Sequence, residues 1–209
     1  HAGLNADQNA VLIISEDAHS SFEKINLIMG LGKNNLIKIK TDDNGCMNIC
    51  DLRRCIDKCY EEGKKIFSIV ATLGTTIRGA IDPIEYISTI CKERNIWLHI
   101  DGSIGGIFAI TKIPIKGLSN VNYANSITIN PQKILGITKT SSILLVSDIE
   151  VLKNTFATGL PYLSCESSTI NRGELGIQGS RPAEVIKLWL GLRFLGMKGI
   201  EDVLSSSIE

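Results

Sequence analysis

The sequence predicts an α/β fold in which a mostly parallel sheet lies between two layers of helices. Two observations carry this prediction. Six short runs are apolar or β-branched throughout, without the polar alternation of a half-exposed sheet, as in strands that are covered on both faces. Helical stretches lie between these runs, and such an alternation of strand and helix is typical of a doubly wound sheet.

The expected strands are the most apolar stretches of the chain. In order, they cover residues 11–15, 36–39, 66–71, 96–101, 126–130 and 142–146. Each is four to six residues long, which is an ordinary strand length. The run at 96–101 ends in Asp101 and is followed by small residues, so packing alone does not explain a carboxylate there.

Helices are expected at residues 21–30, 48–62, 83–94 and 181–195, with a further helical stretch at 200–204. The second has one apolar stripe and stops at Gly63, while the third has Asp82 as its N-cap and Pro83 as its first residue. Residues 156–180 are rich in Gly, Ser and Thr and show no sustained period. They predict a long loop, and loops of this length are usually functional or disordered.

Composition excludes several classes of protein. The 209 residues include 22 Lys or Arg and 22 Asp or Glu, and no basic cluster suggests a nucleic-acid partner. The longest apolar runs are too short to cross a bilayer, so no membrane partner is expected. The first ten residues lack the layout of a signal peptide, which predicts a soluble, cytoplasmic protein.

The six cysteines raise the question of a metal site, because four of them lie close together at Cys46, Cys50, Cys55 and Cys59. Their spacing lacks the C-x2-C pair of common zinc sites, and no histidine is near. Cys55 and Cys59 are expected on one face of a helix. Free thiols are therefore favoured over structural zinc, and no metal site is predicted.

Polar residues follow the ends of several expected strands. They are His19, Thr75, Thr76, Asp101 and the segment 130–133. Ligands of doubly wound sheets bind beyond the carboxyl ends of the strands. An unpaired carboxylate near a core is costly, so Asp101 is expected to have a partner there.

Three of these segments, ATLGTT at 71–76, WLHID at 97–101 and NPQK at 130–133, occur in an order that resembles the pyridoxal-phosphate-dependent group II amino-acid decarboxylases. AHSS at 18–21 and GSR at 179–181 are also similar to that family, most closely to its aromatic branch. The likeness covers nearly the whole chain. It implies the large domain of the PLP-transferase fold type I as a three-layer sandwich, pyridoxal 5'-phosphate as cofactor, an amino-acid substrate and a homodimer.

The resemblance also implies roles for two central residues. Lys133 takes the position of the lysine whose amine forms a Schiff base with the cofactor aldehyde. Asp101 takes the position of the carboxylate that keeps the pyridine nitrogen protonated, so that the ring accepts electrons. From the residues alone, Lys133 is also compatible with a solvated surface lysine, and Asp101 with a helix cap.

Five further positions match functional residues of the family. By this resemblance His19 stacks on the cofactor ring, Thr76 contacts the ring or substrate, and Asn130 and Gln132 contact the phosphate. Tyr162, in the glycine-rich loop, helps to protonate the substrate α-carbon. The alternatives are a surface histidine, a simple strand-to-loop turn and a loop tyrosine without function. For Arg181 only an ion pair at the start of its helix is expected.

Two positions depart from the family pattern. Gln132 stands where a histidine is usual, and glutamine donates to a phosphate but does not carry charge or shuttle protons. Gly102 and Ser103 stand where two alanines are usual, and the resemblance places Ser103 against the face of the cofactor. Both changes bear more on activity than on cofactor binding.

The family is more than twice as long as this chain. Residues 1–195 are expected to form the cofactor-binding large domain without its N-terminal strand and phosphate loop. Residues 196–209 are expected to begin the connection to an absent C-terminal domain, and the strand at 142–146 is expected to be an unprotected edge. The chain is then either a fragment, which is favoured, or is completed by another chain. The expected reaction is decarboxylation of an L-amino acid, with an aromatic side chain favoured. The alternatives are transamination, aldol cleavage or desulfuration on the same fold, or a non-catalytic relative.

Overall fold

Six strands form one sheet in the computed structural model, which describes residues 9–115, 117–138, 141–159 and 171–208. The strands are β1 (Ala10–Ser15), β2 (Leu36–Ile39), β3 (Lys65–Thr72), β4 (Trp97–Gly102), β5 (Ser126–Ile129) and β6 (Ile143–Val146). Each lies within one residue, at either end, of the position that its apolar run predicts.

The strand order is β2-β1-β3-β4-β5-β6. β1 to β5 pair in parallel, and only the last pair, β5 with β6, is antiparallel. This confirms the prediction of a mostly parallel sheet. The ends of β1 to β5 therefore meet along one border of the sheet, called here the carboxyl edge.

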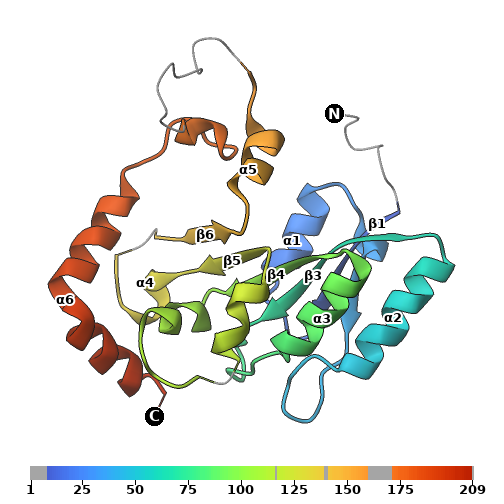
Figure 1. Ribbon diagram of the computed structural model, residues 1–209, viewed down its shortest axis with the longest axis horizontal. Helices are drawn as coiled ribbons and strands as arrows, with labels where there is room; N and C mark the ends of the chain where they lie inside the picture. Colours follow the sequence, from blue (N-terminus) through green and yellow to red (C-terminus); the bar gives the residue numbers. More distant parts are fainter. Residues whose placement is uncertain (1–8, 116, 139–140, 160–170, 209) are drawn as a thin grey trace.

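Helices cover both faces of the sheet, which gives three layers (Figure 1). They are α1 (Ser21–Ile28), α2 (Ile49–Glu61), α3 (Ile84–Arg94), α4 (Pro131–Ile134), α5 (Ile149–Phe156) and α6 (Glu184–Ser206). Four short 3-10 turns connect them: η2 (Lys33–Asn35), η3 (Gly105–Ile110), η4 (Leu118–Tyr123) and η6 (Arg172–Glu174).

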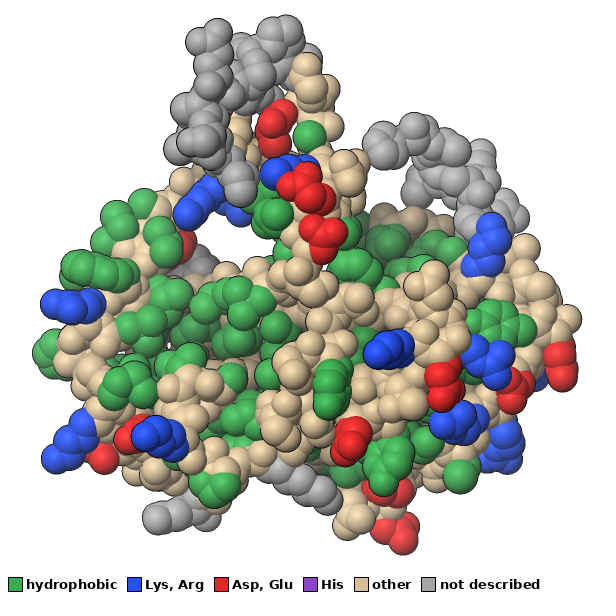
Figure 2. All heavy atoms as spheres, viewed as in Figure 1, with side chains coloured by type: hydrophobic (Ala, Val, Ile, Leu, Met, Phe, Trp, Pro, Cys, Tyr) green, Lys and Arg blue, Asp and Glu red, His purple; other side chains and the backbone are tan. Residues whose placement is uncertain are grey.

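The larger core lies on the face of the sheet that α2, α3 and α6 cover. Leu52 of α2, Ile87 of α3 and Leu204 of α6 all belong to it and are fully buried. The opposite face holds a smaller cluster, in which Phe22 of α1 packs on Val70 and its neighbours. Apolar side chains also lie at the surface along α6 (Figure 2), where Phe194 is 89% exposed.

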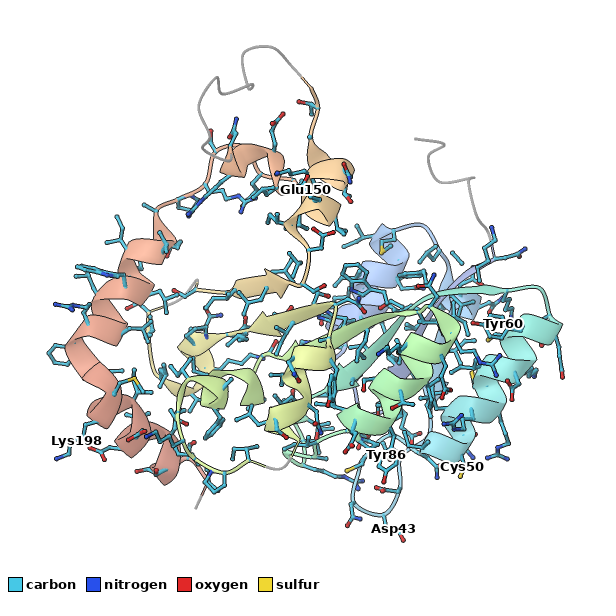
Figure 3. All side chains as sticks on the ribbon, in the orientation of Figure 1. Asp43, Cys50, Tyr60, Tyr86, Glu150 and Lys198 are labelled. Atoms are coloured by element: carbon cyan, nitrogen blue, oxygen red, sulfur yellow. The ribbon has the colours of Figure 1, made fainter. Side chains whose placement is uncertain are left out.

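Local sequence explains where α2 begins and which face it buries. The Asn48 side chain caps the helix by accepting a 3.0 Å hydrogen bond from Asp51 N–H. Leu52, Ile56 and Cys59 then face the sheet, as the predicted stripe requires. Cys50 and Tyr60 mark opposite ends of the helix in Figure 3.

The cysteines of α2 are free thiols. Burial raises the pKa of Cys55 to about 12, and it raises the pKa of Cys59 as well. Both side chains are therefore protonated thiols at neutral pH. Among the described residues, no three His, Cys, Asp or Glu side chains are grouped so that they could hold a metal ion. In the same part of the chain, no helix has both the length and the apolar character needed to cross a membrane.

One prediction about a helix end was wrong. α3 begins at Ile84 with Pro83 at its N-cap, and Asp82 is 1% exposed and accepts hydrogen bonds from Met47 N–H and Thr72 N–H. The Asp-Pro pair has the local sequence of a helix start. The carboxylate instead accepts hydrogen bonds from two other segments, so it does not cap α3. The two helices expected at 181–195 and 200–204 correspond to the two parts of α6, which Gly196 separates with a non-helical backbone (φ 59°, ψ 176°).

Candidate active site at the carboxyl edge

Asp101 lies near the end of β4, between two neighbouring strands. It is 8% exposed, and its Oδ1 accepts a 3.1 Å hydrogen bond from Ser103 N–H. Thr72 of β3 and Thr128 of β5 are its partners in the register on either side. Thr72 Oγ1 is buried and has no hydrogen-bond partner within the described ranges. The carboxyl edge therefore offers a buried carboxylate beside an unsatisfied hydroxyl.

A row of polar side chains runs along the sheet toward Asp101. Trp97 Nε1–H donates to Ser126 Oγ at 2.8 Å, and Ser126 Oγ lies 2.8 Å from His99 Nδ1. Ser126 Oγ accepts the indole hydrogen and also contacts the imidazole, so one hydroxyl links the two rings. Burial lowers the pKa of His99, although the charge of Asp101 opposes this effect. A neutral imidazole therefore lies two residues before the carboxylate.

Lys133 follows β5 at the same edge. Ile129 pairs with Gly102 in the register, so the turn after β5 starts just beyond the level of Asp101. Pro131 is buried and opens α4, and Lys133 N–H bonds to Asn130 O at 3.0 Å. The Lys133 side chain is exposed. Adjacent parallel strands thus deliver an accessible amine and a buried carboxylate to one border of the sheet.

The two residues predicted to contact phosphate flank this turn. Ser142 O–H donates to Asn130 Oδ1 at 2.6 Å. The Nδ2 hydrogens of Asn130 are then the groups that can donate to a ligand. Gln132 Oε1 is buried, and no described residue bonds to it. This oxygen is an acceptor and calls for a donor, whereas the group of Gln132 that can donate to a phosphate is Nε2.

His19 and Thr76 lie on the loops that follow β1 and β3, and both are exposed. His19 Nδ1 accepts from Ser21 N–H at 3.3 Å and lies 2.9 Å from Ser21 Oγ, which leaves Nε2 outward. Thr75, by contrast, is buried, and its hydroxyl accepts from Ala80 N–H at 3.0 Å. Of the two threonines, only Thr76 is free to meet a ligand. Tyr162 lies outside the described residues.

Three glycines after Asp101, at positions 102, 105 and 106, let the chain pass close to its neighbours. A Cβ at Gly105 would lie 2.5 Å from Leu73 O, and one at Gly102 would lie 3.0 Å from Thr128 O. This explains why glycine stands at 102 in place of the usual alanine. Sequence reasoning missed this packing, although glycines directly after an apolar strand signal a close backbone approach.

These groups fit pyridoxal phosphate. A buried carboxylate suits the protonated ring nitrogen, an exposed amine suits the aldehyde, and amide donors suit the phosphate. The unsatisfied atoms of Thr72 and Gln132 lie on the strand beside Asp101 and in the turn that carries Lys133.

Comparison with known families settles the assignment of the fold. The model of the pyridoxal-dependent decarboxylase conserved domain matches residues 3–209.

The chain belongs to this family.

Membership confirms the predicted fold type and the predicted cofactor, and it confirms a decarboxylase-type domain. The roles of single residues remain predictions.

Individual relatives agree with this assignment. The chain is 32% identical to the acidic amino acid decarboxylase GADL1 of Xenopus tropicalis, over 99% of this chain and 41% of that protein. The crystal structure of mouse CSAD matches with a TM-score of 0.86 at 30% identity. The match covers 93% of this chain and 41% of the CSAD chain. Catharanthus roseus tryptophan decarboxylase, solved with L-tryptophan, has a TM-score of 0.83 at 25% identity with the same coverage. The chain therefore spans about two fifths of the length of these family members.

Proposed function

We propose that the protein decarboxylates an L-amino acid to its amine and carbon dioxide with pyridoxal phosphate held at the carboxyl edge. The observation that carries this proposal is the buried Asp101 at the end of β4, beside the β5 turn that presents Lys133. When bound, the cofactor supplies an electron-accepting ring that stabilises the charge left by departing carbon dioxide.

The residues of this chain hold and orient that group. Ser103 N–H fixes Asp101 Oδ1, and the carboxylate then stabilises a proton on the ring nitrogen. Lys133 supplies the amine that binds the aldehyde. Asn130 and Gln132 donate to the phosphate through their amides.

Residues on the loops act on the exposed side of the ring. His19 stacks on it, with Nδ1 held by Ser21 and Nε2 available to the substrate carboxylate. Thr76 contacts the ring or substrate, and Ser103 lies against the ring face. Tyr162 donates a proton at the substrate α-carbon.

The side chain of the substrate is the finer part of the proposal. Residues 18–21 and 71–76 favour an aromatic amino acid. The 32% identity to an acidic amino acid decarboxylase supports a second candidate, glutamate or a sulfinate. We also propose a cytoplasmic homodimer, which sedimentation of the purified protein and fractionation of its source cells test.

The test uses protein expressed from the complete reading frame and substrates labelled at the carboxyl carbon. We expect release of labelled carbon dioxide from either aromatic or acidic amino acids, with an amine as the other product. Lys133→Ala should abolish both this release and the yellow absorbance of bound cofactor. Lys92→Ala is the matched control, because Lys92 is an exposed lysine on α3. Release and absorbance that survive in Lys133→Ala would contradict the proposal.

A further inference from the structure

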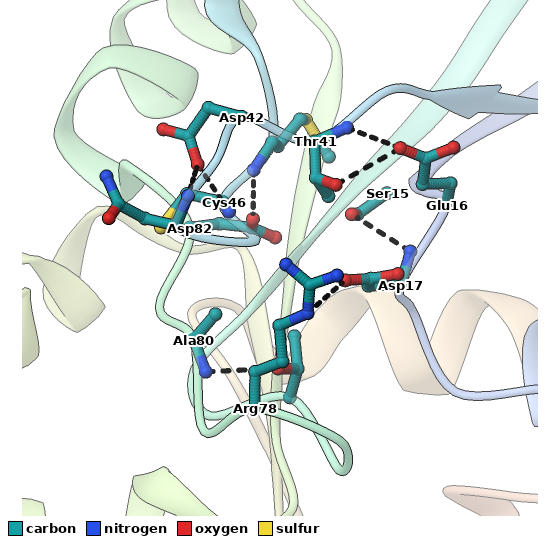
Figure 4. A network of polar contacts seen from close by, with 12 residues as sticks. Ser15, Glu16, Asp17, Thr41, Asp42, Cys46, Arg78, Ala80 and Asp82 are labelled. Atoms are coloured by element: carbon teal, nitrogen blue, oxygen red, sulfur yellow. Dashed lines mark hydrogen bonds and ion pairs between the residues drawn. The ribbon is translucent and has the colours of Figure 1, made fainter.

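Three loops at the carboxyl edge contact one another in a closed triangle (Figure 4). The first follows β1 at residues 16–20, the second follows β2 at 40–48, and the third follows β3 at 73–83. The first carries His19 and the third carries Thr76. The second loop carries none of the proposed site residues.

Two sides of the triangle join the second loop to the others. Glu16 Oε1 accepts from Thr41 N–H at 2.7 Å and lies 3.1 Å from the Thr41 hydroxyl. Asp82 Oδ1 accepts from Met47 N–H at 2.7 Å. These hydrogen bonds hold the second loop against both the first loop and the third loop.

The remaining side is an ion pair that joins the first loop directly to the third. Arg78 Nε lies 3.8 Å from Asp17 Oδ2, and the two side chains are 52% and 20% exposed. The second loop also limits where Arg78 can lie, because a Cβ at Gly45 would be 2.9 Å from Arg78 Cδ. The absence of a side chain at Gly45 thus leaves room for the aliphatic part of Arg78.

The position of this pair in the sequence gives it a consequence for the site. Asp17 lies two residues before His19, and Arg78 lies two residues after Thr76. β1 and β3 are adjacent parallel strands, so the two loops leave the sheet side by side. A contact at this point restrains the distance between the two exposed side chains.

We propose that Asp17 and Arg78 are positioning residues that hold His19 and Thr76 at the spacing needed to enclose the cofactor ring. This inference rests on the proposed function. Neither residue touches the ring in this account. Their effect comes from restricting two loops before the ligand arrives, which lowers the ordering cost of binding.

The pair can be tested without unfolding the protein. An ion pair with a half-exposed partner such as Arg78 contributes little to global stability, in contrast to the fully buried Asp82. Arg78→Asp and Asp17→Arg each place like charges together, and the double variant restores an ion pair in reversed order. Arg94→Asp is the control, because Arg94 is 47% exposed, close to the 52% of Arg78, and pairs with Asp57 at 3.3 Å between α3 and α2.

Two readouts are measured, cofactor affinity by absorbance titration and amide hydrogen exchange of both loops in cofactor-free protein. Each single variant should weaken cofactor affinity about fivefold and speed exchange in residues 16–20 and 73–81, with an unchanged unfolding midpoint. The double variant should recover both properties, and the control should change neither.

Unchanged exchange in the single variants, or a double variant that recovers nothing, would overturn the inference. Absence of cofactor binding by the unmodified protein would instead contradict the proposed function, while the exchange data would still show whether the pair couples the loops.

Discussion

Asp82 is a buried carboxylate whose partners are all backbone amides. Removal from water raises its pKa to about 6, and the hydrogen bonds from Thr72 and Met47 oppose this shift without cancelling it. The folded protein therefore binds the Asp82 proton more tightly than the unfolded chain, in which the carboxyl has its usual value near 3.8. Asp82 therefore contributes less to folding stability at neutral pH than in mild acid.

The sign of this linkage predicts a pH-dependent effect of Asp82→Asn. As pH rises from about 4 to about 6, the contribution of Asp82 to folding stability falls by about 3 kcal/mol. Asparagine does not titrate, so the stability of wild type relative to the variant should be greater at pH 4 than at pH 7. Urea unfolding at both pH values measures the difference, with Asp43→Asn as an exposed control. A difference that is constant or grows with pH would exclude this account of Asp82.

Gly105 has a steric role that predicts a second measurement. In Gly105→Ala the new Cβ would meet Leu73 O at 2.5 Å, and backbone cannot yield as a flexible side chain does. We expect a loss of about 1–3 kcal/mol in the free energy of unfolding. Gly179→Ala has nothing within 4 Å of the new Cβ and should be nearly neutral. Equal stability of the two variants would show that the close approach is unimportant.

Among the elements, α2 depends on a single side-chain cap. Asn48→Ala removes the 3.0 Å bond to Asp51 N–H and should cost about 1 kcal/mol. Asn122→Ala, at an exposed position in η4, serves as the control in the same denaturant titration. If both variants unfold at the same urea concentration, the cap contributes nothing measurable.

β1 was predictable because its side chains are buried on both faces, which leaves a continuous apolar run at residues 11–14. The apolar run of β6 predicted a strand as well, although Leu144 and Leu145 are about half exposed. The antiparallel direction of β6 was not predictable, because a four-residue apolar run can pair in parallel or antiparallel equally well. The resemblance led to Asp101 and Lys133, and the parallel register supports their placement at one edge. Asp82 was misassigned because its partners, Met47 and Thr72, are distant in sequence. Only the folded chain brings them together.

At the scale of the whole molecule, the parallel sheet brings the residues of the proposed site, which are far apart in the sequence, to one border. His19, Thr76 and Lys133 follow β1, β3 and β5, and Asp101 lies near the end of β4. These four strands are consecutive neighbours in the sheet. The sheet fixes the Asp101 carboxylate from below, while loops supply the exposed groups. Binding and chemistry therefore depend on loop spacing that the core does not itself determine.

The most direct test of this account is to identify the lysine that binds the cofactor. Purified protein from the complete reading frame is incubated with pyridoxal phosphate, reduced with borohydride, digested and analysed by mass spectrometry. We expect a pyridoxyl group on Lys133 alone, and no label at other lysines when Lys133 is replaced by alanine. A label on a different lysine, or none in the unmodified protein, would contradict the assignment of the site.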